Sequence, residues 1–447
     1  MDILKVFLWG EEIGRLAWHP VRQLSYFTFN QEFLQRRLDL APLTVSVGSL
    51  QSRRPIFGQE GRKYQGLPPF IADSLPDAWG NQLFERWRVT QRMSERSVSP
   101  LHKLAFIGRR GMGALEFMPE IDRGRPGRID IKALADLAAR VMADRENARI
   151  LPNEALTMQA LILVGTSAGG RQPKAILAIN DATGEVRSGQ VDVGPGFKQY
   201  ILKFGDPARC TAETEQTYYQ MALDAGINMM PSRLLQVDGT MHFLTLRFDR
   251  DATGKLYTQT LAAVCPGVES YEGLLTVCRR LRLPETDCRE VFRRMVFNIL
   301  ANNTDDHDKN FSFIMDRQGR WRLAPAYDLT YIFNYGGYQP EREHCLMAMG
   351  KRCDFTTRDM LSFAKENGIK QPQAIIRKVA TAVASFREKA RENGVRDDLA
   401  ALIADGIHGY LAAWGFEHSS IEGIAYCDSH GRQVTDASIC LAYKGNY

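Results

Sequence analysis

Residues 302–315, NNTDDHDKNFSFIM, place three aspartates, a histidine and a lysine at five successive positions and then turn apolar at once. The run that precedes them, VFRRMVFNILA, is also mostly apolar. Two segments suited to a hydrophobic core therefore enclose a dense cluster of charge, and charged side chains are rarely buried unless they are paired. The cluster is either a solvated surface turn or a functional site, and its spacing bears on that choice.

Asp305 and Asn310 have the D-x-x-x-x-N spacing of a phosphotransferase catalytic loop. There the aspartate orients the proton of the attacking hydroxyl, and the asparagine holds Mg²⁺ against the phosphates. FSFIM, the turn DRQGR and WRLAPAYDL then predict a β-hairpin ending in Asp328, which is the order that protein kinases use. We expect the three oxygen-bearing side chains to converge on Mg²⁺, which prefers oxygen ligands. For His307 a structural hydrogen bond or a phosphate contact is favoured over metal ligation.

A second segment could bind the phosphates. VGTSAGGRQPKAIL, residues 164–177, combines glycines that let backbone N–H groups approach an anion with the cations Arg171 and Lys174. It lacks the Walker spacing, which disfavours a P-loop NTPase, and a glycine-rich hairpin turn is the alternative. Lys203 ends the apolar strand QYILKFG, where a lysine can pair with ATP phosphates. An ordinary surface-edge lysine is the alternative there.

Composition sets the broad class. The chain of 447 residues is 44% hydrophobic and 24% charged, which is ordinary for a globular protein of two or three units. Its net charge of +5 allows anionic partners but is far from polybasic. All eight cysteines lie at or after Cys210 without a CxxC pair, which favours reduced thiols over disulfides or zinc. We expect a cytoplasmic protein, because neither a signal peptide nor a membrane-length apolar run is found.

Apolar periodicity predicts a β-rich front, a mixed middle and a mainly helical back. LTVSV (43–47) and ALILVGTSAGG (160–170) read as strands, and SLPDAWGNQLFERWRV (74–89) as a helix entered through Ser, Pro and Asp. DRGRPGR (122–128) is the best linker. The helices expected in the back are 286–301, 357–367, 371–392 and 396–413.

Several motifs together resemble the HipA family of serine/threonine kinases, the toxins of bacterial type II toxin–antitoxin modules. They are GTSAGGRQPK, TDDHDKNFSF, LRFDR and LAPAYDL, together with GRLAW, FTFN, SLPDAWGNQLF and GRRGMGALEF in the N-terminal third. The resemblance covers residues 1 to about 415. It implies an α+β, kinase-like bilobal fold of the PI3/4-kinase-like or HipA type, with a β-rich N-terminal subdomain and a mainly helical C-terminal lobe. The implied parts are an N-terminal subdomain (1–121), a kinase N-lobe (122–250), a helical catalytic C-lobe (251–423) and an unassigned tail (424–447).

The resemblance also implies roles for matching positions. Asp305 would be the catalytic base, with Asn310 and Asp328 as Mg²⁺ ligands that also contact the nucleotide. The other implied ATP-binding positions are Gly169, Gly170, Lys174, Lys203 and His307 for the phosphates, with the backbone near Leu246 and the ring of Phe248 holding adenine. Ser167 matches the family's regulatory serine, whose autophosphorylation would silence the enzyme.

The implied function is ATP- and Mg²⁺-dependent phosphorylation of a serine or threonine on a bacterial protein. The family points to an aminoacyl-tRNA synthetase, glutamyl-tRNA synthetase in particular, with growth arrest as the result. Two alternatives stay open. One is a lipid or small-molecule kinase with the same nucleotide site. The other is a catalytically idle corepressor that reaches DNA only through a small helix-turn-helix antitoxin resembling HipB.

Overall fold

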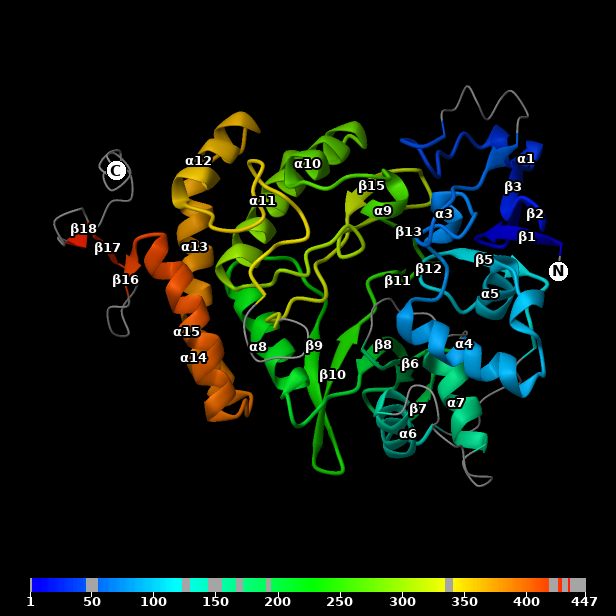
Figure 1. Ribbon diagram of the computed structural model, residues 1–447, viewed down its shortest axis with the longest axis horizontal. Helices are drawn as coiled ribbons and strands as arrows, with labels where there is room; N and C mark the ends of the chain where they lie inside the picture. Colours follow the sequence, from blue (N-terminus) through cyan, green and yellow to red (C-terminus); the bar gives the residue numbers. More distant parts are fainter. Residues whose placement is uncertain are drawn as a thin grey trace. The chain divides into compact units, whose positions relative to one another are not determined.

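The chain folds into two compact units, each assembled from segments that are distant in sequence. The first comprises residues 1–205, 231–266 and 313–321, and the second comprises 206–230, 267–312 and 322–447. The computed structural model (Figure 1) describes residues 2–45, 55–122, 129–143, 155–165, 172–189, 194–333, 341–417, 425–427 and 433–434. The expected linker at 122–128 lies outside these residues, except for Asp122. The domain limits predicted from the sequence stay predictions.

The first unit begins with an antiparallel sheet in the order β4-β3-β2-β1-β5. In β1 the side chains of Leu4, Val6 and Leu8 are buried, whereas Ile3 and Lys5 are exposed, because successive side chains of a strand point to opposite faces. The elements of this part are β1 (Ile3–Leu8), β2 (Glu11–His19), β3 (Leu24–Phe29), α1 (Gln31–Gln35), β4 (Ile56–Phe57), α3 (Pro69–Ala72), α4 (Ala78–Thr90), η1 (Glu95–Ser97), α5 (Pro100–Ile107) and β5 (Leu115–Met118).

A second sheet in the same unit has the order β7-β6-β8-β10-β9. Its core-facing side chains pack with α4, α6 and α7 in one hydrophobic cluster. In β6 every side chain is buried, which matches its nearly continuous apolar sequence. The elements are α6 (Ile131–Ala143), α7 (Ala155–Gly165), β6 (Lys174–Ile179), β7 (Val186–Ser188), β8 (Lys198–Lys203), β9 (Ser232–Val237) and β10 (Thr240–Leu246).

Three local expectations in this unit have clear outcomes. The predicted helix of the SLPDAW segment is confirmed as α4, and its N-cap Asp77 accepts a hydrogen bond from the Gly80 amide at 2.6 Å. The strand predicted at 160–170 is wrong for residues 160–165, which end helix α7. The strand predicted at 43–47 is also wrong for residues 43–45, which lie in a turn and bend. A short apolar run without periodicity does not distinguish a strand from a buried helix.

The remaining elements of the first unit are β11 (Arg250–Asp251), β12 (Gly254–Lys255), β13 (Tyr257–Thr260), α9 (Leu261–Val264) and β14 (Ser312–Met315). Strands β13, β14 and β15 (Trp321–Leu323) form a small sheet in that order, and the chain passes into the second unit within β15. The β-hairpin predicted after the charged cluster is therefore present. Its second strand ends at Leu323, short of the predicted Asp328.

A largely buried ion cluster follows β10, in the LRFDR motif. Asp249 accepts hydrogen bonds from Arg247 Nε at 2.9 Å, Arg250 Nη1 at 2.7 Å and the Gly113 amide at 2.6 Å. The two guanidinium groups also donate to the carbonyl of Gly111 at 3.3 Å. Burial alone would raise the pKa of Asp249, but the two guanidiniums and the Gly113 amide outweigh it and hold that pKa well below its usual value. The cluster thus joins the end of β10 to the loop before β5.

The second unit is mainly helical, as expected. Its elements are α8 (Thr211–Asp224), α10 (Tyr271–Arg280), α11 (Glu285–Leu300), α12 (Thr357–Glu366), α13 (Pro372–Ala384), α14 (Phe386–Glu392), α15 (Asp397–Ala413), β16 (Phe416–Glu417), β17 (Ala425–Cys427) and β18 (Gln433–Val434). In Figure 1, α13, α14 and α15 lie together, and α8 and α11 pack against α13. The helix predicted over 371–392 is two helices divided at Ser385, and α10 was not predicted.

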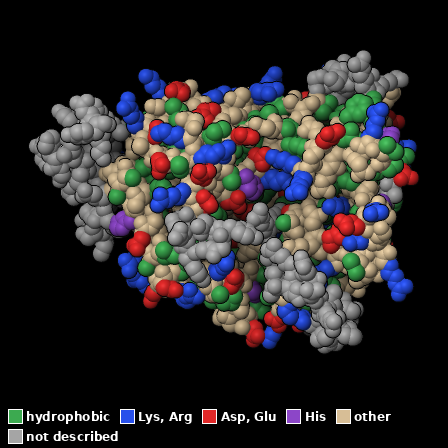
Figure 2. Space-filling model, viewed as in Figure 1, with side chains coloured by type: hydrophobic (Ala, Val, Ile, Leu, Met, Phe, Trp, Pro, Cys, Tyr) green, Lys and Arg blue, Asp and Glu red, His purple; other side chains and the backbone are tan. Residues whose placement is uncertain are grey.

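The surface carries both signs of charge. Figure 2 shows lysine, arginine, aspartate and glutamate side chains interspersed over the visible face. This mixture agrees with the small net charge of the chain. Among the described helices, none has the length and apolar character needed to span a membrane.

We predict that Asp249→Asn lowers the free energy of unfolding by about 3–5 kcal/mol at pH 7, because it leaves two buried arginines without their anion. A carboxyl group with a depressed folded-state pKa stabilises the fold above its unfolded pKa of about 3.9 and loses that contribution as the pH falls further. The difference between wild type and variant should therefore narrow below about pH 4. Urea titrations between pH 7 and pH 3 measure it. The exposed Asp251→Asn serves as the matched control, and an equal loss there would contradict the prediction.

Candidate active site

The charged cluster forms a loop directly after α11. Most of α11 is buried, and Phe311 and Phe313 after the loop are buried too, so both apolar flanks reach the core. Within the loop the two adjacent aspartates differ sharply: the side chain of Asp305 is 54% exposed, whereas that of Asp306 is fully buried. The reading of Asp306 as a solvated surface residue is therefore wrong.

Asp306 is buried because its carboxyl group accepts four hydrogen bonds. Its Oδ2 accepts from the Tyr271 hydroxyl at 2.6 Å and from His344 Nδ1 at 2.9 Å. Its Oδ1 accepts from the amides of Cys345 at 2.8 Å and Leu346 at 3.3 Å. Buried polar groups persist only when they are satisfied in this way. Asp306 therefore joins the loop to α10 and to the 344–346 segment.

The same network continues along α11 toward Asn303. Burial, and then the proximity of Asp306, raise the pKa of Tyr271 well above its usual value, so its hydroxyl stays protonated and donates. Asn298 Nδ2 donates to the Tyr271 oxygen at 3.0 Å, and Asn303 Nδ2 donates to Asn298 Oδ1 at 2.9 Å. The orientation of each amide is thereby fixed by its neighbour. The loop is anchored at Asn303 as well as at Asp306.

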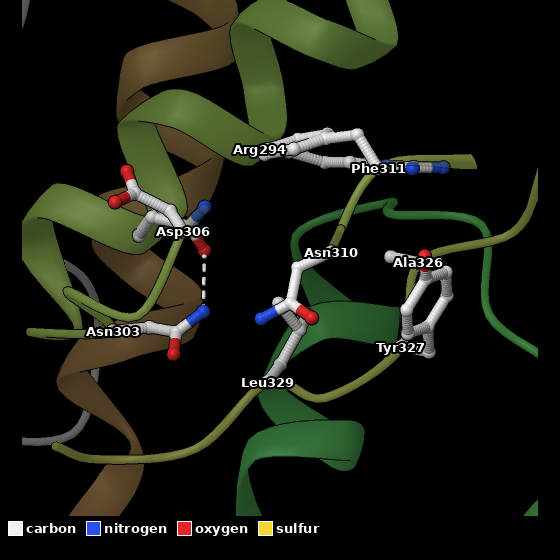
Figure 3. Close-up of a pocket in the computed structure, with 9 residues that line it drawn as sticks. Arg294, Asn303, Asp306, Asn310, Phe311, Ala326, Tyr327 and Leu329 are labelled. Atoms are coloured by element: carbon white, nitrogen blue, oxygen red, sulfur yellow. Dashed lines mark hydrogen bonds between the residues drawn. The ribbon is translucent and has the colours of Figure 1, made fainter. Parts of the chain in front are cut away.

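A small pocket with room for about one water molecule, about 10 Å³, opens beside this network. Figure 3 shows the side chain of Asn310 lying between Asn303 and Tyr327. The residues that line the pocket are Arg294, Asn298, Asn303, Asp306, Asn310, Phe311, Ala326, Tyr327 and Leu329. All of them belong to the second unit.

Asn310 is held in a defined orientation by the predicted catalytic residue. Its Nδ2 donates to the backbone carbonyl of Asp305 at 2.6 Å. This bond assigns the amide nitrogen to Asp305 and leaves the amide oxygen as the group that can bind a cation. The structure thus connects the two ends of the D-x-x-x-x-N motif.

The segment that carries Asp328 is fastened to the same loop. Arg294 Nη2 donates to the carbonyl of Ala324 at 2.9 Å, and the Tyr327 hydroxyl donates to the carbonyl of Lys309 at 2.7 Å. Asp328 has a left-handed backbone with φ of +54°, a conformation that non-glycine residues seldom adopt and that is frequent at functional sites. Its two chain neighbours line the pocket beside Asn310. The structure therefore brings the Asp328 segment next to Asn310.

His307 has the structural hydrogen bond that was one of its expected roles. Its Nδ1 accepts from the Lys309 amide at 3.1 Å, which tightens the turn. Its Nε2 lies 3.7 Å from Asp305 Oδ1, and the ring is 40% exposed. The ring therefore lies beside the predicted base. Its assignment to the nucleotide stays a prediction.

The predicted phosphate-binding lysines form a pair in the first unit. Lys174 opens β6 and Lys203 ends β8, and the antiparallel register places them directly opposite each other. Lys174 is 2% and Lys203 7% exposed, so the reading of Lys203 as a surface-edge residue is wrong. Ser167, Gly169 and Gly170 lie outside the described residues. Their assigned roles stay predictions.

The predicted adenine segment begins where β10 ends. The amide of Leu246 donates to the carbonyl of Pro231 at 2.9 Å, and the amide of Arg247 donates to that of Gln199 at 3.0 Å. These two N–H groups are therefore committed to the fold, and adenine would have to use other groups of the segment. The ring of Phe248 is half-buried. Both assigned roles stay predictions.

The chemistry of the donor set fits a hard cation of the Mg²⁺ type. Among the described residues, no group of three or more His, Cys, Asp or Glu side chains could hold a metal ion by themselves. Mg²⁺ needs only one or two protein oxygens, because its other ligands are waters and phosphates. Asn310 and Asp328, the two predicted ligands, carry oxygen donors of this kind, and their role as ligands stays a prediction. Neither thiolate nor imidazole ligands are involved, so a zinc site is not indicated.

Sequence reasoning missed the residues that hold the site together. Tyr271 and His344 bind Asp306 from 35 and 38 positions away, and Arg294 binds Ala324 from 30 positions away. The only local signal was that Asp306 and Arg294 stand beside apolar runs. A polar residue next to a core segment is a candidate for a buried, bonded role.

A sequence profile described as the HipA N-terminal domain matches residues 4–118, and one described as the HipA-like C-terminal domain matches residues 166–386. The chain is 28% identical over 414 residues to "Putative kinase Y4mE" of Sinorhizobium fredii, covering 86% of this chain and 90% of that protein. It is 26% identical over 204 residues to a "Putative kinase" of Haemophilus influenzae, covering 41% of this chain and 57% of that protein.

Among solved structures, the chain is similar to HipA of Shewanella oneidensis, determined in a complex with HipB and its operator DNA. The TM-score is 0.64 at 16% identity, covering 92% of this chain and 96% of that chain. This likeness confirms the predicted α+β fold of the HipA type.

We predict that the two adjacent aspartates respond oppositely to truncation. Asp306→Ala leaves two backbone amides, a tyrosine and a histidine without their acceptor, and should lower the free energy of unfolding by about 3–5 kcal/mol. Asp305→Ala removes an exposed carboxylate and should change it by less than about 0.5 kcal/mol. Chemical denaturation of both variants measures the contrast. Equal effects would contradict the buried anchor.

A second prediction uses Cys345, an exposed thiol whose Sγ lies 4.0 Å from Asp305 Oδ1. Partial burial and the carboxyl groups of Asp306 and Asp305 raise the pKa of Cys345 to about 11. Only the thiolate reacts, so iodoacetamide labelling should keep accelerating above pH 9. Asp305→Asn should speed labelling at pH 8 by roughly two- to fivefold, because a nearby negative charge is gone. Peptide mass spectrometry measures the rate, and Cys345→Ser identifies the peptide. An unchanged rate would contradict this geometry.

Proposed function

The chain belongs to the HipA family, and from that premise we propose that it is an ATP- and Mg²⁺-dependent serine/threonine protein kinase. One observation carries the proposal: the Asp305 carbonyl orients the Asn310 amide, at a pocket lined by both neighbours of Asp328. A phosphotransferase needs a base and oxygen ligands for its metal close together, and this bond and pocket support that role for the loop and the short segment.

In this proposal Asp305 accepts the proton of the substrate hydroxyl. Its side chain is half-exposed, so an acceptor side chain can reach it from solvent. The Asn310 oxygen and Asp328 hold Mg²⁺, which neutralises charge on the phosphates during transfer. The buried Asp306 network keeps the loop in place before substrate arrives, and such pre-organisation lowers the barrier because no rearrangement is needed at the moment of reaction.

Lys174 and Lys203 bind the ATP phosphates in this proposal. The two lysines stand opposite each other on adjacent strands and are both buried, so one anion bound at this end of the strands could contact both. A triphosphate supplies that anion. The proposal assigns Leu246, Phe248 and His307 to the nucleotide as well.

Regulation and substrate belong to the same proposal. Phosphate on Ser167 would add nearly two negative charges in the segment assigned to ATP phosphates and would exclude them. The acceptor is a serine or threonine of a bacterial protein, for which glutamyl-tRNA synthetase is the first to test. A lipid or small-molecule acceptor is the alternative, since the nucleotide machinery does not choose the acceptor.

We also propose a small helix-turn-helix partner. The Shewanella oneidensis HipA whose fold the chain shares was solved with HipB and operator DNA. Positive and negative side chains are mixed on the face seen in Figure 2, which favours DNA contact through the partner over direct binding. A DNA mobility shift that needs the antitoxin from the adjacent reading frame supports this, and a shift by the chain alone contradicts it.

We predict that Asp305→Asn lowers phosphoryl transfer by about 10²–10⁴-fold, because the hydroxyl proton loses its acceptor. Binding of Mg²⁺–ATP should stay within about threefold of wild type, since the base does not hold the nucleotide. Radiolabel transfer from ATP and calorimetric nucleotide binding measure the two quantities.

Asp308→Asn, with the same charge change in the same loop, is the matched control and should keep activity. Screening protein, lipid and small-molecule acceptors separates the protein kinase from its alternatives. Absence of transfer to any acceptor, and to the chain itself, would overturn the proposed function and favour the idle corepressor.

A further inference from the structure

Helix α4 of the N-terminal domain contacts the proposed phosphate-binding lysine with two side chains. The indole Nε1 of Trp79 donates to the backbone carbonyl of Lys174 at 3.0 Å, in a fully buried position. One carboxyl oxygen of Asp77 lies 4.0 Å from Lys174 Nζ, and the other caps α4 by accepting from the Gly80 amide. The start of α4 therefore contacts both the main chain and the ammonium group of Lys174.

This junction is too closely packed to be incidental. Gly165, the last residue of α7, has no side chain, and a Cβ there would lie 2.6 Å from Leu83, 3.0 Å from the Trp79 indole nitrogen and 3.1 Å from the Lys174 carbonyl. The contact with Leu83 is to the end of a flexible side chain, which could move aside, whereas the contacts with the indole nitrogen and the Lys174 carbonyl are close to the lower limit for real Cβ atoms. The end of α7, helix α4 and the start of β6 are thus closely packed at this junction.

The contact between α4 and Lys174 is also electrostatic. Lys174 stands opposite Lys203 in the register of β6 and β8, and both residues are buried, where a charged ammonium group is costly without a nearby negative charge. The carboxyl group of Asp77 is only 13% exposed and supplies negative charge beside Lys174 but on α4, not on the sheet. At 4.0 Å this negative charge favours the charged form of Lys174.

We propose that Asp77 and Trp79 are positioning residues that hold Lys174 for phosphate binding, so that the N-terminal domain completes the nucleotide site of this protein. The inference rests on the proposed function for the identity of the ligand. The contact between α4 and Lys174 does not depend on it. Neither residue touches the nucleotide in this scheme, and both act through Lys174.

Asp77→Asn is the sharpest variant. Asparagine is as good an N-cap as aspartate, so the bond to Gly80 and the stability of α4 are kept while the charge is lost. We expect the Kd of Mg²⁺–ATP to rise roughly three- to tenfold, because one partly buried charge contact is lost. The kcat should change less than the KM. Glu85→Gln removes a half-exposed charge, paired with Arg88, from the same helix and should leave the Kd unchanged.

A double-mutant cycle shows whether Asp77 acts through Lys174. In a Lys174→Met background, Asp77→Asn should have no further effect on nucleotide affinity, because its target is gone. Fully additive losses would overturn the proposal. Trp79→Phe, which removes only the N–H donor, should weaken nucleotide binding in the same non-additive way.

The titration of Lys174 in the nucleotide-free protein separates this inference from the proposed function. Carbon NMR of protein labelled at lysine Cε reports it, with the signal assigned by its absence in Lys174→Met. Removing the nearby negative charge in Asp77→Asn should lower the titration midpoint of Lys174, and Glu85→Gln should not. An unchanged midpoint in Asp77→Asn overturns the positioning role even if the kinase is active. A lowered midpoint in a protein that binds no nucleotide supports the positioning role and overturns the proposed function instead.

Discussion

The carboxyl group of Asp306 is the contact on which the candidate site depends. It is completely buried and accepts from Tyr271, His344 and the amides of Cys345 and Leu346. Because these donors are buried, water cannot replace the carboxyl group as their acceptor. Any other arrangement of the loop would leave several buried donors unsatisfied, each at a cost of about 1–3 kcal/mol. The loop therefore has one favoured conformation, in which Asp305 is exposed and Asn310 enters the pocket. The buried Asp306 thus holds in place the exposed Asp305, which we propose as the catalytic base.

The difference between these neighbours shows what the sequence could and could not predict. The spacing of Asp305, Asn310 and Asp328 is local, and it singled out a loop and a following segment that the structure places around one pocket. The burial of Asp306 depends on residues 35 to 40 positions away, and local spacing carries no information about them. His307 falls between these cases. Its structural bond is made two residues away and was within reach of local reasoning.

The errors in the fold have the same origin. Helix α4 was predicted because it has a polar cap followed by helical spacing. The apolar run at 160–165 has no period and was read as a strand, although the packing of α7 against α4 and β6 makes it helical. The strand expected to reach Asp328 stops at Leu323, since Pro325 has no N–H for a ladder and Asp328 has a left-handed backbone. The proline indicates the end of the strand in the sequence itself, whereas the sequence does not indicate the left-handed backbone of Asp328.

In the first unit, the N-terminal domain contacts the sheet that carries the lysine pair. Strand β8, which ends in Lys203, lies between β6 and β10. The start of β6 is held by Trp79 on α4, and the end of β10 is held by Asp249, which binds the Gly113 amide. Both contacts are buried, and they hold β6 and β10, the two strands on either side of β8. A displacement of the N-terminal domain would therefore move both strands that flank Lys203, and the spacing of the lysine pair depends on that domain being in place.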